Sequence, residues 1–441
     1  MQKKCLLALV LAAMMLLSGC ALIGVDEEID NARVIVDVNG ETITKGVFNT
    51  MVNYQIEQNQ YYNDMYSTYF GYSAGYPTDA ETVQQEVLDG YIENLVSVQK
   101  IKELGLDQLT EEEAAQVQKS ADEEYALFLD QVAMYYLSGE ELEGDALTAR
   151  AEEYAAANGL GTKENYLSSA TTEKEFEKLK AYAVKDVTVS QEEVTASYDE
   201  KVAADKEAYA SQDAYINARN YGAVVYYTPA GMRQVKQILV KFTEEDNALI
   251  TEKTTAQTEA QNALNTAQTN LDNAAEDADM DALKAALADA QTALDEAATA
   301  LKDAKAAAAR NILAKAEEIY ALAAAEGADF DALVAQYNED TAAPAEGYLV
   351  GADTTAYVTP FTEGAMELAS IGAVSQPVLT DYGYHILQYA ADVAEGPVAL
   401  ETVQAGIEAE LLTAKQEEAY TAAVDEWIAQ ADVKTYPNRL N

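Results

Sequence analysis

Cysteine and histidine are scarce in this chain of 441 residues. It has two cysteines, Cys5 and Cys20, and one histidine, His385. Both cysteines lie within residues 1–20, so the rest of the chain has no thiol to form a disulfide, act as a nucleophile or bind a metal. Because only one histidine is available as well, we expect neither a zinc nor a copper site.

Basic residues are also few. Lysine and arginine together number 28, against 76 aspartates and glutamates, which gives a formal net charge of −48. Binding to nucleic acid or to an anionic membrane surface needs a basic face. We therefore expect no nucleic-acid partner. The acidity favours solubility, and the alternative is a preference for basic segments of a partner protein.

The first 19 residues have the features of a signal peptide. Two lysines precede the apolar run 6–17, which is too short for an ordinary transmembrane helix. The run ends in Leu17-Ser18-Gly19-Cys20, which resembles a bacterial lipobox. We expect cleavage before Cys20, two acyl chains on this residue, and a tether over 20–33. An ordinary secretory signal with an incidental cysteine is the alternative.

Residues 34–228 predict a small sheet followed by helices. The run 33–38 has the alternation of a strand, Asn39-Gly40 is typical of a tight turn, and Thr44 would cap the helix that follows. Further helix boundaries are indicated by Gly105, in a C-cap position, and by a capping box that begins at Thr110. The run 187–189 predicts a strand that enters another capped helix.

Tyrosine is abundant, with 29 copies, and seven of them fall between Tyr54 and Tyr76. An amphipathic ring can bury one face and keep its hydroxyl in water, which suits a surface that holds varied unfolded chains. Ordinary packing is the alternative. Tyr62, Tyr66 and Tyr69 have helical spacing, so we expect some of them in the core.

Residues 243–308 are rich in alanine and predict an inserted arm. Apolar residues recur in steps of four and three on both sides of a polar break at 272–281. This heptad pattern favours an antiparallel helical hairpin with a coiled-coil seam. A single long helix or a partly disordered insert is the alternative. We expect a new helix at 312–325 and assign no chemistry to the arm.

The segments on either side of this insert resemble a parvulin-type peptidyl-prolyl isomerase domain, over 229–242 and 309–393. The first strand would be Val235 to Val240. The landmarks that follow in the family's order are an acidic turn at Asn338-Glu339-Asp340, a strand at Gly347-Tyr348-Leu349, a helix at Pro360-Phe361, the run Gly372 to Val378, and Gly383-Tyr384-His385-Ile386. The Val-Asn-Gly turn near residue 39 is similar to the start of the chaperone domain in PrsA/SurA-like foldases.

This resemblance implies a site that needs no metal and no cofactor. It implies catalytic positions at His385, Asp340, Gln237 and Thr380. Phe361 would hold the proline ring, with Tyr357 and Leu349 as further walls.

Gln237 departs from the family pattern, which has a histidine here. A glutamine can still donate and accept hydrogen bonds, but it cannot titrate near neutral pH. Two functions therefore stay open. One is an isomerase that acts on X-Pro bonds of secreted proteins, and the other is a holdase chaperone whose isomerase domain has lost catalysis. A solute-binding lipoprotein is disfavoured because no alternating strand and helix pattern is present.

The resemblance implies an α+β, mostly helical, discontinuous chaperone domain at 34–228. An isomerase domain at 229–393 would be inserted into it, with a small antiparallel sheet, helices and the hairpin 243–308. A helix and strand at 394–441 would return to the chaperone domain, pairing near Val34 to Val38. The expected place is the outer face of the cell membrane, with unfolded secreted proteins as partners. The sequence does not determine whether the protein is a monomer or a homodimer.

Overall fold

The computed structural model describes residues 29–275 and 278–439. The expected signal peptide, Cys20 and most of the expected tether lie outside these ranges. The described chain is mostly helical with small antiparallel sheets, so the predicted α+β class is confirmed. It divides into two compact units. One comprises the described residues up to Val189 together with those from Ala409 on, and the other is Ser190–Glu408.

The first unit is built on a three-stranded antiparallel sheet. Strands β1 (Val34–Val38) and β2 (Glu41–Thr44) are joined by the predicted turn, in which Asn39 and Gly40 have φ values of 53° and 91°. The last strand, β9 (Val433–Thr435), pairs with Val36 to Val38 of β1, as the sequence predicts. The structure thus brings two distant parts of the chain into one sheet.

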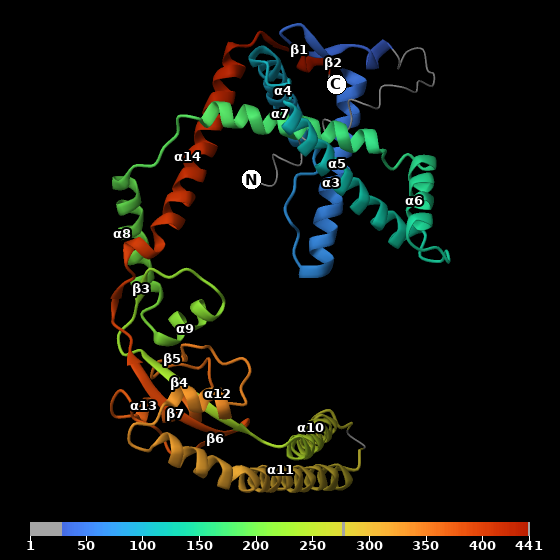
Figure 1. Cartoon of the computed structure of the whole chain (residues 1–441). Coiled ribbons are helices and arrows are strands. Elements are labelled where there is room, and N and C mark those ends of the chain that lie inside the picture. Colours follow the sequence, from blue (N-terminus) through green and yellow to red (C-terminus); the bar gives the residue numbers. More distant parts are fainter. Residues whose placement is uncertain (1–28, 276–277, 440–441) are drawn as a thin grey trace. The chain divides into compact units, whose positions relative to one another are not determined.

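Five helices follow β2, and part of another returns to the same unit. They are α3 (Lys45–Phe70), α4 (Ala80–Leu104), α5 (Glu111–Tyr136), α6 (Asp145–Ala157), α7 (Lys163–Val184) and the later part of α14 (Leu400–Gln430) (Figure 1). The predicted boundaries at Gly105 and Thr110 are confirmed, the latter with a complete capping box. Thr44 precedes α3, but its side chain makes no capping hydrogen bond.

Two local predictions for this unit are wrong. Residues 187–189 form no strand, because the chain passes directly from α7 to a capping box at Ser190 without a partner strand beside it. None of Tyr62, Tyr66 and Tyr69 is buried. The loop 71–79 folds back on the end of α3, where Asn59 and Asn63 donate to the carbonyl oxygens of Pro77 and Tyr76.

The second unit contains a four-stranded antiparallel sheet in the order β5-β4-β7-β6. Its strands are β5 (Tyr348–Val350), β4 (Arg233–Lys241), β7 (Gly383–Asp392) and β6 (Val378–Thr380). The two long central strands pair along their length, with Ile238 opposite Ile386 and Gln237 opposite Leu387. Side chains alternate between the two faces of such a sheet, and each face has its own helices.

One face of this sheet packs on α11 (Met280–Ala323) and α12 (Phe330–Tyr337). Ile238, Val240 and Ile386 lie there, against buried residues of α11 such as Ile312 and Ile319. The other face carries Val235 and Leu387, which pack on α13 (Thr359–Glu367) through Phe361 and Ala365. Gln237 and His385 belong to this second face because they alternate with Ile238 and Ile386.

The insert forms two long helices side by side, α10 (Glu244–Asp272) and the first part of α11 (Figure 1). The predicted polar break separates them. The expected new helix at 312–325 is instead the continuation of α11, which runs unbroken to Ala323. Residues 304–309 are almost all alanine, the best helix former, so nothing interrupts the helix there.

Shorter elements join the second unit to its flanks. Helices α8 (Gln191–Ala208) and α9 (Gln212–Asn220) precede a two-stranded pair, β3 (Tyr227–Thr228) with β8 (Gly396–Pro397). The Tyr198 hydroxyl of α8 donates to the Val398 carbonyl at 2.6 Å. Residues 190–228 therefore group with the second unit, whereas the sequence placed the boundary near residue 228. Compact units need not coincide with the domains that the family resemblance implies, so the domain boundaries stay a prediction.

Candidate functional site

A chain of hydrogen-bonded side chains crosses the second face of the four-stranded sheet. Gln237 Nε2 donates to Asp340 Oδ2 at 2.6 Å, and Gln237 Oε1 lies 2.6 Å from His385 Nδ1. On the far side, His385 Nε2 lies 2.8 Å from the Thr380 hydroxyl. The four residues that the sequence singled out as catalytic therefore form one connected row.

This row fixes the proton positions on the imidazole. Because the Gln237 amide nitrogen donates to Asp340, its oxygen is left to accept, so His385 Nδ1 must carry a proton. In a neutral ring Nε2 is then an acceptor, and the Thr380 hydroxyl donates to it. The backbone N–H of Tyr382 donates to the same hydroxyl oxygen at 3.1 Å. Every member of the row has a partner.

Burial sets the charge state of the row. Gln237 and His385 are each 5% exposed. Burial lowers the pKa of His385 to about 4, although the Asp340 carboxylate acts in the opposite direction. The imidazole is therefore neutral at pH 7 and holds one proton at Nδ1.

The elements around the row explain its order. Gln237 is in β4, Thr380 ends β6 and His385 is in β7, so the sheet fixes three of the four members. Asp340 lies in the loop after α12, which Asn338 ties to β4 through its side-chain oxygen and the Leu239 N–H at 2.9 Å. The Glu339 N–H also donates to the Leu239 carbonyl at 3.0 Å.

An aromatic wall adjoins the imidazole. The ring of Phe361, which is 4% exposed, meets the ring of His385 edge to face at a centroid distance of 5.4 Å. Tyr357 and Tyr348 lie 5.5 Å and 5.6 Å from Phe361, and 5.3 Å from each other. The three aromatic rings therefore pack on one another and form an apolar surface beside the polar row.

Tyr348 is the residue that sequence reasoning missed. Its hydroxyl donates to Asp340 Oδ2 at 2.7 Å, so it joins the aromatic wall to the polar row. Burial, and then this hydrogen bond, raise the pKa of Tyr348. Leu349, the expected wall, packs instead against the cluster of Tyr215, Ile216 and Met232, because neighbours in a strand face opposite ways. That alternation is the signal that could have favoured Tyr348.

Arg233 positions the helix that carries Phe361. Its Nη1 lies 2.8 Å from the Met366 carbonyl oxygen and 2.9 Å from that of Leu368, at the C-terminal end of α13. The guanidinium also stacks over the ring of Tyr389 at 4.5 Å. A cation at a helix C-terminus satisfies carbonyl groups that have no partner within the helix.

The site has the groups for binding and orienting a neutral ligand. Within residues 29–275 and 278–439 no three side chains of the metal-binding types come together. The Thr380 hydroxyl, which donates to the imidazole, is itself buried, at 8% exposed. What the arrangement offers is an apolar aromatic surface next to fixed hydrogen-bonding groups, with a neutral imidazole between them.

Comparisons with known proteins agree with this location. Residues 284–391 match the family model described as the PPIC-type PPIase (rotamase) domain. That range includes His385, Asp340, Thr380 and Phe361 and leaves out β4, which the inserted arm separates from the rest. The match assigns a PPIC-type PPIase domain to this part of the chain.

Curated relatives are named foldase protein PrsA. That of Clostridium botulinum (strain Okra) is 32% identical over 116 residues, which is 25% of this chain and 34% of the relative. That of Caldanaerobacter subterraneus is 31% identical over 136 residues, covering 30% and 43%. The matched part thus spans only about a third to two fifths of these relatives.

Solved structures with detectable likeness include a SurA-like chaperone of Campylobacter jejuni. It is 14% identical, with a TM-score of 0.24, and the match covers 92% of this chain and 100% of that one. PrsA from Bacillus subtilis is 16% identical, with a TM-score of 0.19 and coverage of 91% and 94%.

Proposed function

We propose that this chain, which carries a PPIC-type PPIase domain, catalyses cis–trans isomerisation of X-Pro bonds in unfolded proteins. The observation that carries the proposal is the aromatic wall of Phe361, Tyr357 and Tyr348 beside the row from Asp340 to Thr380. A proline ring is flat-sided and apolar, which suits packing on an aromatic surface. The polar row beside it suits the imide.

The reaction needs rotation and no proton transfer. An amide rotates slowly because resonance gives its C–N bond double-bond character, with a barrier of roughly 18–20 kcal/mol. The twisted imide loses this resonance, so it is less polar and fits a site from which water is excluded. In this proposal, Phe361, Tyr357 and Tyr348 hold the ring, and the neutral His385 stays fixed by Gln237 and Thr380.

Gln237 is compatible with this mechanism. The position has to orient the imidazole of His385, and an amide does so by accepting from Nδ1 while its nitrogen donates to Asp340. A titrating side chain is not required, since no proton moves in the reaction. With glutamine in place of the family's histidine, the imidazole of His385 is still held at both nitrogens.

The first test is exchange kinetics by NMR on short X-Pro peptides with the full chain. We expect acceleration that falls about tenfold or more in Phe361→Ala, because loss of the ring misplaces the bound proline. Phe330→Ala is the matched control. Phe330 is also 4% exposed, but it packs on the opposite face of the sheet. Equal losses of isomerisation rate in both variants would indicate unfolding and would count against proline binding by the aromatic wall.

A second pair of variants tests the row. We expect Gln237→His to raise the isomerisation rate and His385→Ala to lower it. Near-zero rates in the natural chain and in both variants would reject the enzymatic function.

We also propose that the protein acts on the outer face of the cell membrane, to which a lipid group on Cys20 anchors it. No helix in the described part of the chain has the length and apolar character to cross a bilayer. Support comes from the lipobox-like run before Cys20, since two acyl chains give stable anchoring. Cys20→Ser should release the protein from the membrane fraction. A variant that stays bound would contradict the anchor.

Holding unfolded chains without catalysis is a second candidate function. A separate observation favours it, since Tyr69 is 77% exposed and Phe70 and Tyr72 are exposed beside it at the end of α3. The rings of Phe70 and Tyr72 contact each other and the ring of Tyr66. Replacing Tyr69, Phe70 and Tyr72 by serine should weaken suppression of client aggregation while leaving peptide isomerisation unchanged. Unchanged suppression would exclude this surface.

A further inference from the structure

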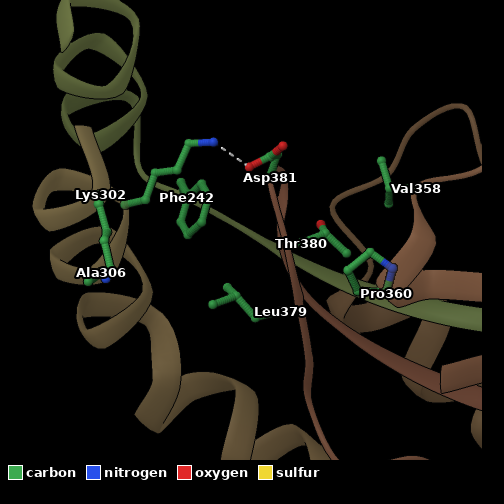
Figure 2. A pocket seen from close by; sticks show the side chains of 9 residues that line it. Phe242, Lys302, Ala306, Val358, Pro360, Leu379, Thr380 and Asp381 are labelled. Carbon is green, nitrogen blue, oxygen red and sulfur yellow. Dashed lines mark hydrogen bonds and ion pairs between the residues drawn. The ribbon is translucent and has the colours of Figure 1, made fainter. Parts of the chain in front are cut away.

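A pocket of about 370 Å³ opens beside the end of the polar row (Figure 2). Thr380, whose hydroxyl meets His385 Nε2 at 2.8 Å, also lines the pocket. The pocket therefore shares Thr380 with the site described above and lies at the end of β6. Its volume falls in the range of ordinary ligand pockets.

The inserted arm supplies one wall of this pocket. Lys302, Lys305 and Ala306 of α11 lie on one side, and Figure 2 shows Val358 and Pro360, at the start of α13, on the other. The α11 residues precede residue 309 and so belong to the segment that interrupts the domain in the sequence. Without the arm, this side of the pocket would be open to solvent.

The lining of the pocket is apolar with a cationic edge. Phe242, Leu379, Val358 and Pro360 present carbon surfaces. Lys305 is neutralised by Asp381, at 2.6 Å between Nζ and Oδ1. Among the residues that the structure describes, Lys302 has no such ion pair. It is thus an unneutralised cation in a chain with 76 acidic residues and 28 basic ones.

We propose that this pocket is a second peptide subsite, built by the inserted arm. It takes an apolar side chain of the client segment whose proline lies among Phe361, Tyr357 and Tyr348, and Lys302 pairs with a carboxylate next to that side chain. The inference rests on the proposed function and adds a preference among its substrates. Val358 and Pro360 of the pocket are sequence neighbours of Tyr357 and Phe361, so a residue close to the proline would occupy the pocket.

The test compares binding of fluorescent proline peptides by anisotropy, using the full chain. The peptides carry one leucine and either glutamate or lysine beside it, at each position within three residues of the proline. We expect the glutamate peptide to bind about two- to fivefold more tightly at the position that reaches the pocket, as a solvent-exposed ion pair allows. Salt at about 0.5 M should remove most of this difference.

Lys302→Glu should abolish or reverse the preference. Lys284→Glu is the matched control, because Lys284 is an exposed lysine of the same helix that does not line this pocket. A preference that is equal in the natural chain and in Lys302→Glu would overturn the proposal, as would the absence of any preference in the natural chain.

A second variant tests the apolar part of the pocket. Ala306→Trp should fill the pocket and weaken binding of the leucine peptides, whereas Ala300→Trp, an exposed position on the same helix, should not. Equal affinities in these two variants would count against the subsite.

The two proposals fail in different ways. A preference that depends on Lys302 in a protein that does not accelerate isomerisation would keep the subsite and reject the enzyme. Acceleration without any such preference would keep the enzyme and reject the subsite.

Discussion

Burial lowers the pKa of His385 to about 4, from an ordinary value of 6.5. The unfolded chain therefore binds more protons than the folded one between these two values, and the folded state loses stability as the pH falls through this window. His385 is the only histidine, so no other side chain ordinarily titrates between pH 5 and 8.

We predict that lowering the pH from 7 to 5 reduces the stability of the four-stranded sheet by about 2 kcal/mol through this residue. The measurement is urea unfolding followed by hydrogen exchange of the β4 and β7 amides. His385→Gln provides the control, because it removes the titration but leaves all carboxylates in place. The same loss in both proteins would assign the effect to the carboxylates.

Individual residues also show how far sequence reasoning reached. Gln237, His385, Asp340 and Thr380 were found from their positions in a known pattern, and the structure brings them into one row. Tyr348 was missed in favour of Leu349, since two adjacent strand residues differ only in which face they occupy. That choice is made by pairing with β4, between residues more than a hundred positions apart.

At the scale of elements, the turn between β6 and β7 depends on a glycine. Gly383 has a φ of 138°, and a Cβ there would lie 2.0 Å from the Val240 carbonyl oxygen. The close approach lets β7 pair with the end of β4 and brings Thr380 to His385. No other residue type can occupy this position without moving one of the strands.

We predict that Gly383→Ala destabilises the second unit by about 2–3 kcal/mol, through strain and the clash with β4. Gly372→Ala separates the two causes, since Gly372 also has a positive φ, of 84°, but nothing within 4 Å of the added Cβ. It should cost about 1 kcal/mol, for the backbone conformation alone. Equal losses in thermal unfolding would show that the contact with Val240 is unimportant.

Helix α13 depends on Arg233 from the neighbouring strand. We predict that Arg233→Met speeds hydrogen exchange in α13 and lowers the isomerisation rate, because the last carbonyls of the helix lose their donor and Phe361 loses its support. Lys236→Met is the control in the same strand. Lys236 pairs with the exposed Asp331 on the opposite face, so its loss should leave α13 unchanged. Similar exchange in both variants would argue against the support.

The inserted arm shows which features of secondary structure can be predicted from the local sequence. Apolar steps of four and three residues predicted two helices and the break between them, because the seam is local. The fusion with the following helix was missed, although alanines at 304–309 gave no reason to stop. At 187–189 the β-branched residues suggested a strand, but a strand needs a partner, and the local sequence cannot supply one.

At the scale of the whole molecule, the charge of −48 is the dominant property. We predict that raising the salt from about 0.02 to 0.5 M increases the melting temperature by a few degrees, because screening weakens repulsion among acidic groups. The described ion pairs are mostly at the surface and individually weak, for example Lys119 with Glu123. A melting temperature that falls with salt, by calorimetry, would mean that these pairs outweigh the repulsion.

The pairing of β1 with β9 has a consequence in time. Val38 meets Val433 in the first sheet, so this unit needs residues from both ends of the described chain. Synthesis delivers the amino end first, and by then only β2 is present to pair with β1. The four-stranded sheet, with all its strands between residues 233 and 392, can close earlier. The part of the molecule that begins first is therefore completed last, and until then one edge of its first strand is open to any other chain that emerges beside it.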